Sequence, residues 1–205
     1  ALEDLNYKEN KVARILANGK TEFVGIIVPN LRNHYYSEIL NQLLLSYEEF
    51  GYKFLVFIGN EHPETERQYI QELMAYKIEG LIILSFTIPS QELADLHIPI
   101  VTIEREDKYV SSVNTDNYMG GVQATSLLLN HNCDVFIHLN SPTAPDVPAY
   151  GRIQGFLDIC QENNLNHKII YRVLGNTYDQ IRQNLSEIIS QLEQDYLQQR
   201  KGNFV

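Results

Sequence analysis

Residues 23–28 read Phe-Val-Gly-Ile-Ile-Val, a short and almost wholly apolar run. A run of this length and composition is typical of a β-strand. Similar runs follow at 54–58, 81–84 and 99–103, and they alternate with helical stretches near 34–50, 63–77 and 90–96. This alternation predicts β-α-β units that build a parallel sheet. Gly51 stands where the first helix needs a left-handed residue to end, and Gly80 opens the third strand.

The same series then begins again. We expect strands at 110–114, 134–139 and 169–173, helices at 117–131, 149–164 and 177–199, and the start of a strand at Phe204-Val205. The charged stretch 104–108 separates the two series. The chain therefore reads as an α/β protein with two similar halves, 22–103 and 104–205. Ligands of open α/β sheets bind outside the carboxyl ends of the strands, so a pocket is expected between the halves.

Composition limits the kind of protein. The chain has 205 residues, 44% of them hydrophobic, which is enough for one large domain or two small ones. Its net charge is −10, and residues 1–20 carry four Lys/Arg against three Asp/Glu, a net of +1 that leaves −11 for the rest. Because nucleic-acid binding depends on cations that neutralise phosphates, the acidic core is not expected to hold DNA by itself.

Two cysteines, Cys133 and Cys160, are too few for a disulfide scaffold, so a reducing compartment is expected. The sequence contains no signal peptide and no apolar run long enough to cross a bilayer. These features favour the cytoplasm.

Residues 7–21, Tyr-Lys-Glu-Asn-Lys-Val-Ala-Arg-Ile-Leu-Ala-Asn-Gly-Lys-Thr, lie directly ahead of the first apolar run. They resemble the hinge of the lactose/galactose repressor family, in which a tyrosine, an asparagine and an Ala-x-x-Leu stand at this spacing. Residues 1–21 would then be the end of a DNA-binding head and its hinge helix. Its helix-forming part, residues 9–17, is shorter than the roughly 12–15 residues at which isolated helices become marginal, so it would gain order on DNA.

The resemblance implies specific DNA contacts. Leu16 would enter the minor groove and bend the duplex, as wedge residues do. Lys11 and Arg14 would contact phosphates or the groove floor, and Asn10 belongs to the same matching pattern. Apolar spacing alone gives another interpretation, an amphipathic terminal helix packed on the core through Leu2, Leu5, Val12 and Leu16.

The same resemblance refines the expected fold. It implies two doubly wound parallel-sheet subdomains of the periplasmic-binding-protein-like type, and a second subdomain that is incomplete because the chain stops at the seventh strand. The alanine at position 1 and the missing reading helix indicate a fragment.

Candidate ligand residues follow the strands. Asn30, Tyr35 and Tyr36 come after the first strand, Ser85 and Phe86 after the third, and Glu104 and Arg105 after the fourth. In the family, the position between the first strand and the first helix contacts effector, and Glu104 stands where sugar-sensing relatives often have an aspartate. Tyr35 and Tyr36 have an alternative interpretation as core or dimer-contact aromatics.

Arg152 is the strongest candidate in the second half, since Arg-Ile-Gln-Gly-Phe at 152–156 resembles the family's Arg-x-x-Gly-Phe motif. A guanidinium offers a planar fork of donors for vicinal hydroxyls, carboxylate or phosphate. The other interpretation is a surface arginine paired with Asp158 or Glu104. The nearby stretch 116–121 reads as a helix N-cap followed by small residues for close helix packing.

Catalytic signatures are missing from the sequence. It has no Gly-x-Ser-x-Gly elbow, no P-loop and no Gly-x-Gly-x-x-Gly. His131 and Cys133 would make half a metal site at most. We expect no catalysis, no cofactor and no metal.

The sequence thus predicts a bacterial transcriptional repressor that acts as a homodimer on operator DNA. A small-molecule effector, with sugar favoured by the resemblance, would bind between the two halves and change the order of the hinges. The alternative is a sugar-binding protein that delivers its ligand to a transporter, which would leave the hinge pattern unexplained.

Overall fold

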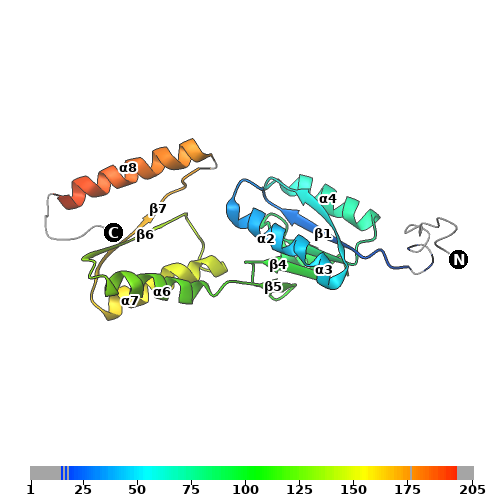
Figure 1. Ribbon diagram of the computed structural model, residues 1–205, viewed down its shortest axis with the longest axis horizontal. Helices are drawn as coiled ribbons and strands as arrows, with labels where there is room; N and C mark the ends of the chain where they lie inside the picture. The colour runs from blue at the N-terminus through cyan, green and yellow to red at the C-terminus, as the bar shows by residue number, and fades with distance from the viewer. Residues whose placement is uncertain (1–14, 16, 18, 176, 198–205) are drawn as a thin grey trace, which may run out of the picture. The chain divides into compact units, whose positions relative to one another are not determined.

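The computed structural model (Figure 1) describes residues 15, 17, 19–175 and 177–197, which form two units that divide between Val113 and Asn114. The expected DNA contacts Asn10, Lys11, Arg14 and Leu16, and the strand start at 204–205, lie outside the described residues. Just before the first strand, the Gly19 amide donates to the Ile15 carbonyl at 2.8 Å, and Gly19 has a left-handed φ of 70°.

The first unit is built on a five-stranded parallel sheet. Its strands are β1 (Phe23–Val28), β2 (Lys53–Ile58), β3 (Gly80–Ile83), β4 (Ile100–Ile103) and β5 (Ser111–Val113), in the order β2-β1-β3-β4-β5. Its helices are α2 (His34–Leu45), α3 (Tyr47–Phe50), α4 (Pro63–Ala75) and α5 (Ser90–Ala94). The predicted parallel sheet is confirmed.

Both faces of this sheet are covered, which explains the uninterrupted apolar run of β1. Ile26 and Val28 pack with Leu40 of α2, whereas Ile27 packs with Leu73 of α4 on the opposite face. Full burial of each such side chain stabilises the fold by about 1.5–3 kcal/mol. Successive side chains of a strand point to opposite faces, so a strand between two helical layers has no position for a polar residue.

The first predicted helix, 34–50, is divided in two at Ser46. Its hydroxyl donates to the Leu43 carbonyl at 2.6 Å, and the chain restarts as α3. Gly51 ends α3 with φ 74° and donates its amide to the Tyr47 carbonyl, as predicted.

The second unit contains a two-stranded parallel sheet, β6 (Val135–Asn140) and β7 (Asn166–Tyr171). Helices α6 (Asn117–Asn130) and α7 (Gly151–Glu162), the latter preceded by the short 3-10 turn η1 (Pro148–Tyr150), cover one side, and α8 (Tyr178–Leu197) lies on the other (Figure 1). Phe136 is fully buried with Phe156 and both cysteines, between the sheet and this helix pair. Asp116 caps α6 by accepting from the Met119 amide at 3.0 Å, as the sequence predicted.

The division between the units lies later in the chain than the predicted boundary between residues 103 and 104. The segment 110–114 was expected to open the second half, but β5 pairs with β4 in the first sheet, Val101 opposite Ser111 and Ile103 opposite Val113. The Thr102 hydroxyl stabilises the connection between β4 and β5, because it donates to the carbonyls of Arg105 at 2.9 Å and Ser111 at 3.3 Å.

Across the described parts of the chain, no helix has both the length and the apolar character that a bilayer crossing requires.

Candidate functional site

The expected ligand residues of the first unit share one edge of its sheet. Strands β1, β3 and β4 are neighbours, with Ile27 opposite Ile83 and Ile83 opposite Thr102. Because all three strands run in the same direction, the segments that follow them emerge at the same edge. Asn30, the pair 85–86 and the pair 104–105 are therefore placed on adjacent loops.

The loop after β1 is shaped by two asparagines. The Asn30 side-chain oxygen accepts from the amides of Arg32 and Asn33, at 3.1 and 3.0 Å, which folds the chain into a tight turn. Asn33 then caps α2 by accepting from the Tyr35 amide at 3.0 Å. The turn fixes where α2 begins, and with it the direction of the first helical residues.

Tyr35 and Tyr36 behave differently although they are adjacent. Their rings meet edge to face, 5.4 Å apart. Tyr36 packs against the core beneath α2, and burial, assisted by the negative charge of Glu61, raises the pKa of its phenol. Tyr35 keeps 41% of its surface exposed. The core interpretation thus describes Tyr36 in part, while Tyr35 beside it is partly exposed.

Ser85 and Phe86, after β3, also have different surroundings. Ser85 is buried and donates its hydroxyl to Glu66 Oε2 at 2.5 Å, whereas Phe86 is 49% exposed. Glu66, from the first turns of α4, was not among the predicted site residues. A carboxylate on an amphipathic helix ordinarily indicates a solvated position, but this one is fully buried.

Glu104 and Arg105 follow β4. Glu104 has a left-handed φ of 57° and donates its amide to the Val113 carbonyl at 3.0 Å. The half-buried Arg105 guanidinium donates to the carbonyls of Ser85, at 3.4 Å, and Ile88. Burial lowers the pKa of Arg105, while the negative charges of Asp107 and Glu66 oppose that shift. Arg105 therefore stabilises the loop after β3, and some of its N–H groups are already hydrogen-bonded within the protein.

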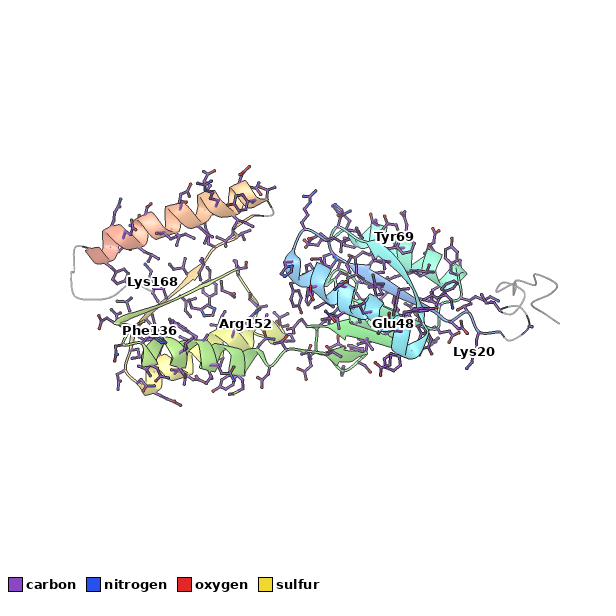
Figure 2. The ribbon with its side chains drawn as sticks, in the orientation of Figure 1. Lys20, Glu48, Tyr69, Phe136, Arg152 and Lys168 are labelled. Carbon is purple, nitrogen blue, oxygen red and sulfur yellow. The ribbon has the colours of Figure 1, made fainter. Side chains whose placement is uncertain are left out.

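In the second unit, Arg152 lies at the start of α7 (Figure 2) and is exposed. Its Nε donates to the Ala149 carbonyl at a long 3.5 Å. Asp158, the partner suggested by the alternative interpretation, instead accepts from the Tyr118 hydroxyl at 3.0 Å and from Gln154 at 2.7 Å. Among the described residues of this unit, the exposed Arg152 guanidinium has no ion-pair partner.

The charge of Arg152 affects the pKa of His138 on β6. Burial lowers the pKa of its imidazole, and the positive charge of Arg152 lowers it further. The ring lies 5.1 Å from that of Phe156, centre to centre. Hence Arg152 is close enough to the carboxyl half of β6 to act on groups there, although sequence reasoning did not select His138.

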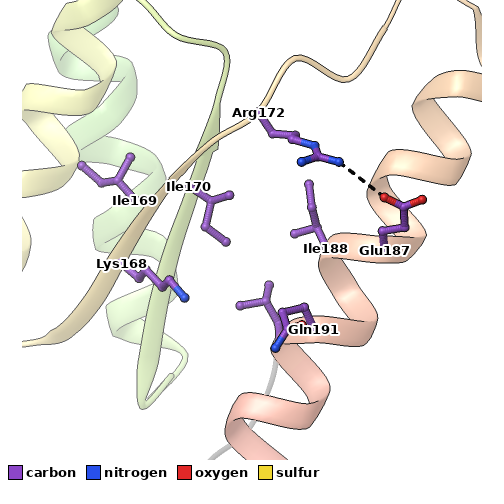
Figure 3. A pocket seen from close by; sticks show the side chains of 8 residues that line it. Lys168, Ile169, Ile170, Arg172, Glu187, Ile188 and Gln191 are labelled. Carbon is purple, nitrogen blue, oxygen red and sulfur yellow. Dashed lines mark hydrogen bonds and ion pairs between the residues drawn. The ribbon is translucent and has the colours of Figure 1, made fainter.

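A separate cavity of about 370 Å³ opens between β7 and α8 (Figure 3). It is lined by isoleucines and a leucine together with charged and amide side chains: Lys168, Ile169, Ile170, Arg172, Glu187, Ile188, Gln191 and Leu192. Arg172 and Glu187 pair across it at 3.4 Å. None of the predicted ligand residues lines this cavity. Within the described residues, no group of three or more His, Cys, Asp and Glu side chains could hold a metal ion.

Comparison with known proteins gives a consistent result. Residues 21–192 match the family described as periplasmic binding proteins and sugar binding domain of LacI family. The ribose operon repressor of Halalkalibacterium halodurans is 27% identical over 171 residues, which cover 83% of this chain and 51% of the repressor. The sucrose operon repressor of Streptococcus mutans is 28% identical over 168 residues, 82% of this chain and 52% of the repressor. The chain spans about half the length of these relatives, which are named as regulators rather than enzymes.

Solved structures agree on the fold. The transcription regulator CcpA of Lactococcus lactis superposes with a TM-score of 0.69 at 17% identity, covering 82% of this chain and 64% of the regulator. A periplasmic binding protein/LacI transcriptional regulator from Alkaliphilus metalliredigens, complexed with D-xylulofuranose, gives 0.65 at 25% identity and covers 74% of this chain and 56% of that protein. The predicted periplasmic-binding-protein-like architecture is thereby confirmed.

Proposed function

Because the chain belongs to the family of periplasmic binding proteins and LacI-family sugar-binding domains, we propose that it is the effector-binding core of a transcriptional repressor. The observation that carries this proposal is the naming of its relatives: both the ribose and the sucrose operon repressors align over more than four fifths of the chain. The function is sequence-specific binding of operator DNA, controlled by a small molecule and without catalysis. The proposed repressor acts in the cytoplasm.

A sugar is the proposed effector. The Alkaliphilus metalliredigens protein was solved with D-xylulofuranose, and the relatives are named for ribose and sucrose operons. The exposed rings of Tyr35 and Phe86 offer apolar faces to a sugar ring. Such faces, combined with a few polar groups, are what small-molecule sites in proteins usually present.

Polar groups of both units complete the proposed set. In the first unit they are Asn30, Tyr36, Ser85, Glu104 and Arg105, and in the second Arg152. The exposed guanidinium of Arg152 would donate to hydroxyls or to a phosphate group of the effector.

A homodimer is proposed from an exposed apolar surface on the first unit. Leu45, Tyr47 and Phe50, at the end of α2 and in α3, expose 56%, 48% and 62% of their surface. The neighbouring edge strand β2 also exposes Val56 and Ile58. Exposed apolar groups that form a contiguous patch mark sites of protein contact.

The hinge carries the DNA contact in this proposal. Leu16 enters the minor groove, Lys11 and Arg14 contact the backbone, and Asn10 completes the motif. Effector and operator then affect each other's binding reciprocally, typically by 1–3 kcal/mol, or roughly 5- to 150-fold in affinity.

The test is operator binding by the intact protein, measured by fluorescence anisotropy with and without ribose, sucrose and xylulose. At least one sugar is expected to change operator affinity by roughly fivefold or more. Arg152→Gln should abolish that response and leave effector-free DNA binding unchanged. Arg182→Gln, which changes an exposed arginine of α8, is the matched control.

The rival function, delivery of a sugar to a transporter, predicts a different outcome. Sugar binding would then be retained while no promoter fragment is bound, and the protein would be recovered outside the cytoplasm. Either observation would refute the repressor proposal.

A further inference from the structure

Glu66 is a buried acid whose surroundings call for an explanation. It projects from α4 with none of its surface exposed. Oε2 accepts from the hydroxyls of Ser85, at 2.5 Å, and Thr87. Oε1 is buried and has no hydrogen-bond partner among the described residues. Enclosing a carboxylate is costly, so a fold that keeps one is using its charge or its geometry.

The chain makes room for this carboxylate at Gly59, directly after β2. A Cβ at Gly59 would stand 2.7 Å from Glu66 Cδ and closer still to Cγ and Oε1, so no other residue fits without displacing the acid. The negative charge also acts on Arg105, where it opposes the lowering of the arginine pKa by burial. Glu66 is thus in contact with the segments that follow β2 and β3, and it acts electrostatically on the segment that follows β4.

The two hydroxyl donors flank Phe86. Ser85 is buried and Thr87 is half-buried, both bonded to one oxygen, while the residue between them is 49% exposed. Holding both neighbours inward leaves the Phe86 ring directed outward. A carboxyl group offers two acceptor oxygens, whereas an amide offers one and places an NH₂ donor at the other position, which suits an acid better than an amide here.

We propose that Glu66 is the positioning residue that holds the loop after β3 and thereby presents the Phe86 ring at the strand-end edge of the first unit. That the presented ring serves effector binding rests on the function proposed above. The positioning itself does not, and it can be measured without any effector.

The measurement uses a fluorescent reporter at the ring position. The chain contains no tryptophan, so Phe86→Trp introduces a single one. In this background Glu66→Gln neutralises the acid at constant size, and Thr87→Val removes one donor at constant size. Glu64→Gln is the matched control, because Glu64 is an exposed carboxylate on the same helix, with 85% of its side chain accessible.

Acrylamide quenching and anisotropy are then recorded below the unfolding transition of each variant. We expect Glu66→Gln and Thr87→Val each to raise the quenching constant at least about twofold and to lower the anisotropy, with Glu64→Gln unchanged. An acid that only supports stability would lower the melting temperature and leave both signals of the folded protein unaltered. Unchanged quenching and anisotropy in both Glu66→Gln and Thr87→Val would overturn the proposal. If Glu66→Gln does not fold, the result for Thr87→Val decides.

Sugar affinity of the intact protein separates the two proposals. If the unmodified protein binds none of the sugars but the reporter responds, the positioning role stands and the effector function fails. If sugars bind and Glu66→Gln weakens that binding about tenfold or more, with Glu64→Gln neutral, the positioned loop is part of the effector site. Equal sugar affinity of Glu66→Gln and Glu64→Gln would show that the positioned loop is not part of the effector site.

Discussion

Two adjacent glycines of α6 offer a controlled test of how the second unit is held together. A Cβ at Gly121 would lie 3.0 Å from both the carbonyl carbon and Cα of Arg152, and closer to its carbonyl oxygen. A Cβ at Gly120 would meet nothing within 4 Å. Both residues are helical, so Gly120→Ala and Gly121→Ala share the same local gain and differ only in the helix contact.

The magnitude follows from this difference. Replacing a helical glycine by alanine favours the helix by about 0.8–1.0 kcal/mol, and this is the expected gain for Gly120→Ala. At Gly121 the obstacle is the backbone of α7, which cannot rotate away as a side chain can. Overpacking of this kind typically costs 1–3 kcal/mol, so the two variants should differ by roughly that amount. Gly121→Ala is expected to be the less stable of the two.

The assay must report on the second unit alone, since a two-unit chain does not have to unfold in one step. Cys133 and Cys160 both belong to the buried cluster of that unit, so thiol labelling in increasing urea follows its unfolding. Gly121→Ala should expose the thiols at a lower urea concentration than the unmodified chain, and Gly120→Ala at a higher one. Equal midpoints for the two variants would mean that α6 and α7 do not approach as closely as described.

Four further predictions concern buried or half-buried groups. Gly59→Ala should destabilise the first unit by about 1–3 kcal/mol through overpacking against Glu66, and much less in a Glu66→Ala background, a non-additivity that a double-mutant cycle in urea detects. Because the pKa of His138 is lowered in the folded protein, the unfolded state binds more protons and stability should be lost as pH falls below about 6.5 toward the folded pKa. Arg152→Gln should raise the pKa of His138 in an NMR titration, and an unchanged value would disprove the proximity. Burial raises the pKa of the Cys160 thiol to about 11, so Ellman's reagent at pH 8 should label it only after unfolding, and rapid labelling of the native protein would contradict its burial.

The sequence predicted what repeated physical patterns encode. Strand β1 was found residue for residue, because a strand covered on both faces has to be apolar throughout. The Asp116 cap was found because a short acidic side chain ahead of an apolar helix has few other uses. The pattern predicted a strand at 110–114 but assigned β5, Ser111–Val113, to the wrong half, and it missed the polar start of β7 at Asn166–Lys168. Local patterns carry no information about which sheet a short polar strand joins.

The predicted site residues could also be selected only in part from the sequence. Position after a strand was enough to select Ser85, Phe86 and Arg105, because topology alone brings the ends of parallel strands together. It could not reveal that two of these three turn inward, Ser85 to an acid and Arg105 to loop carbonyls. On the proposal made above, the Phe86 ring is distinguished from its supporting residues by the enclosed carboxyl group of Glu66, which comes from a helix that follows a different strand. On this proposal two features arrange the site: the order of the strands brings the loops together, and the buried Glu66 determines which loop side chains stay exposed.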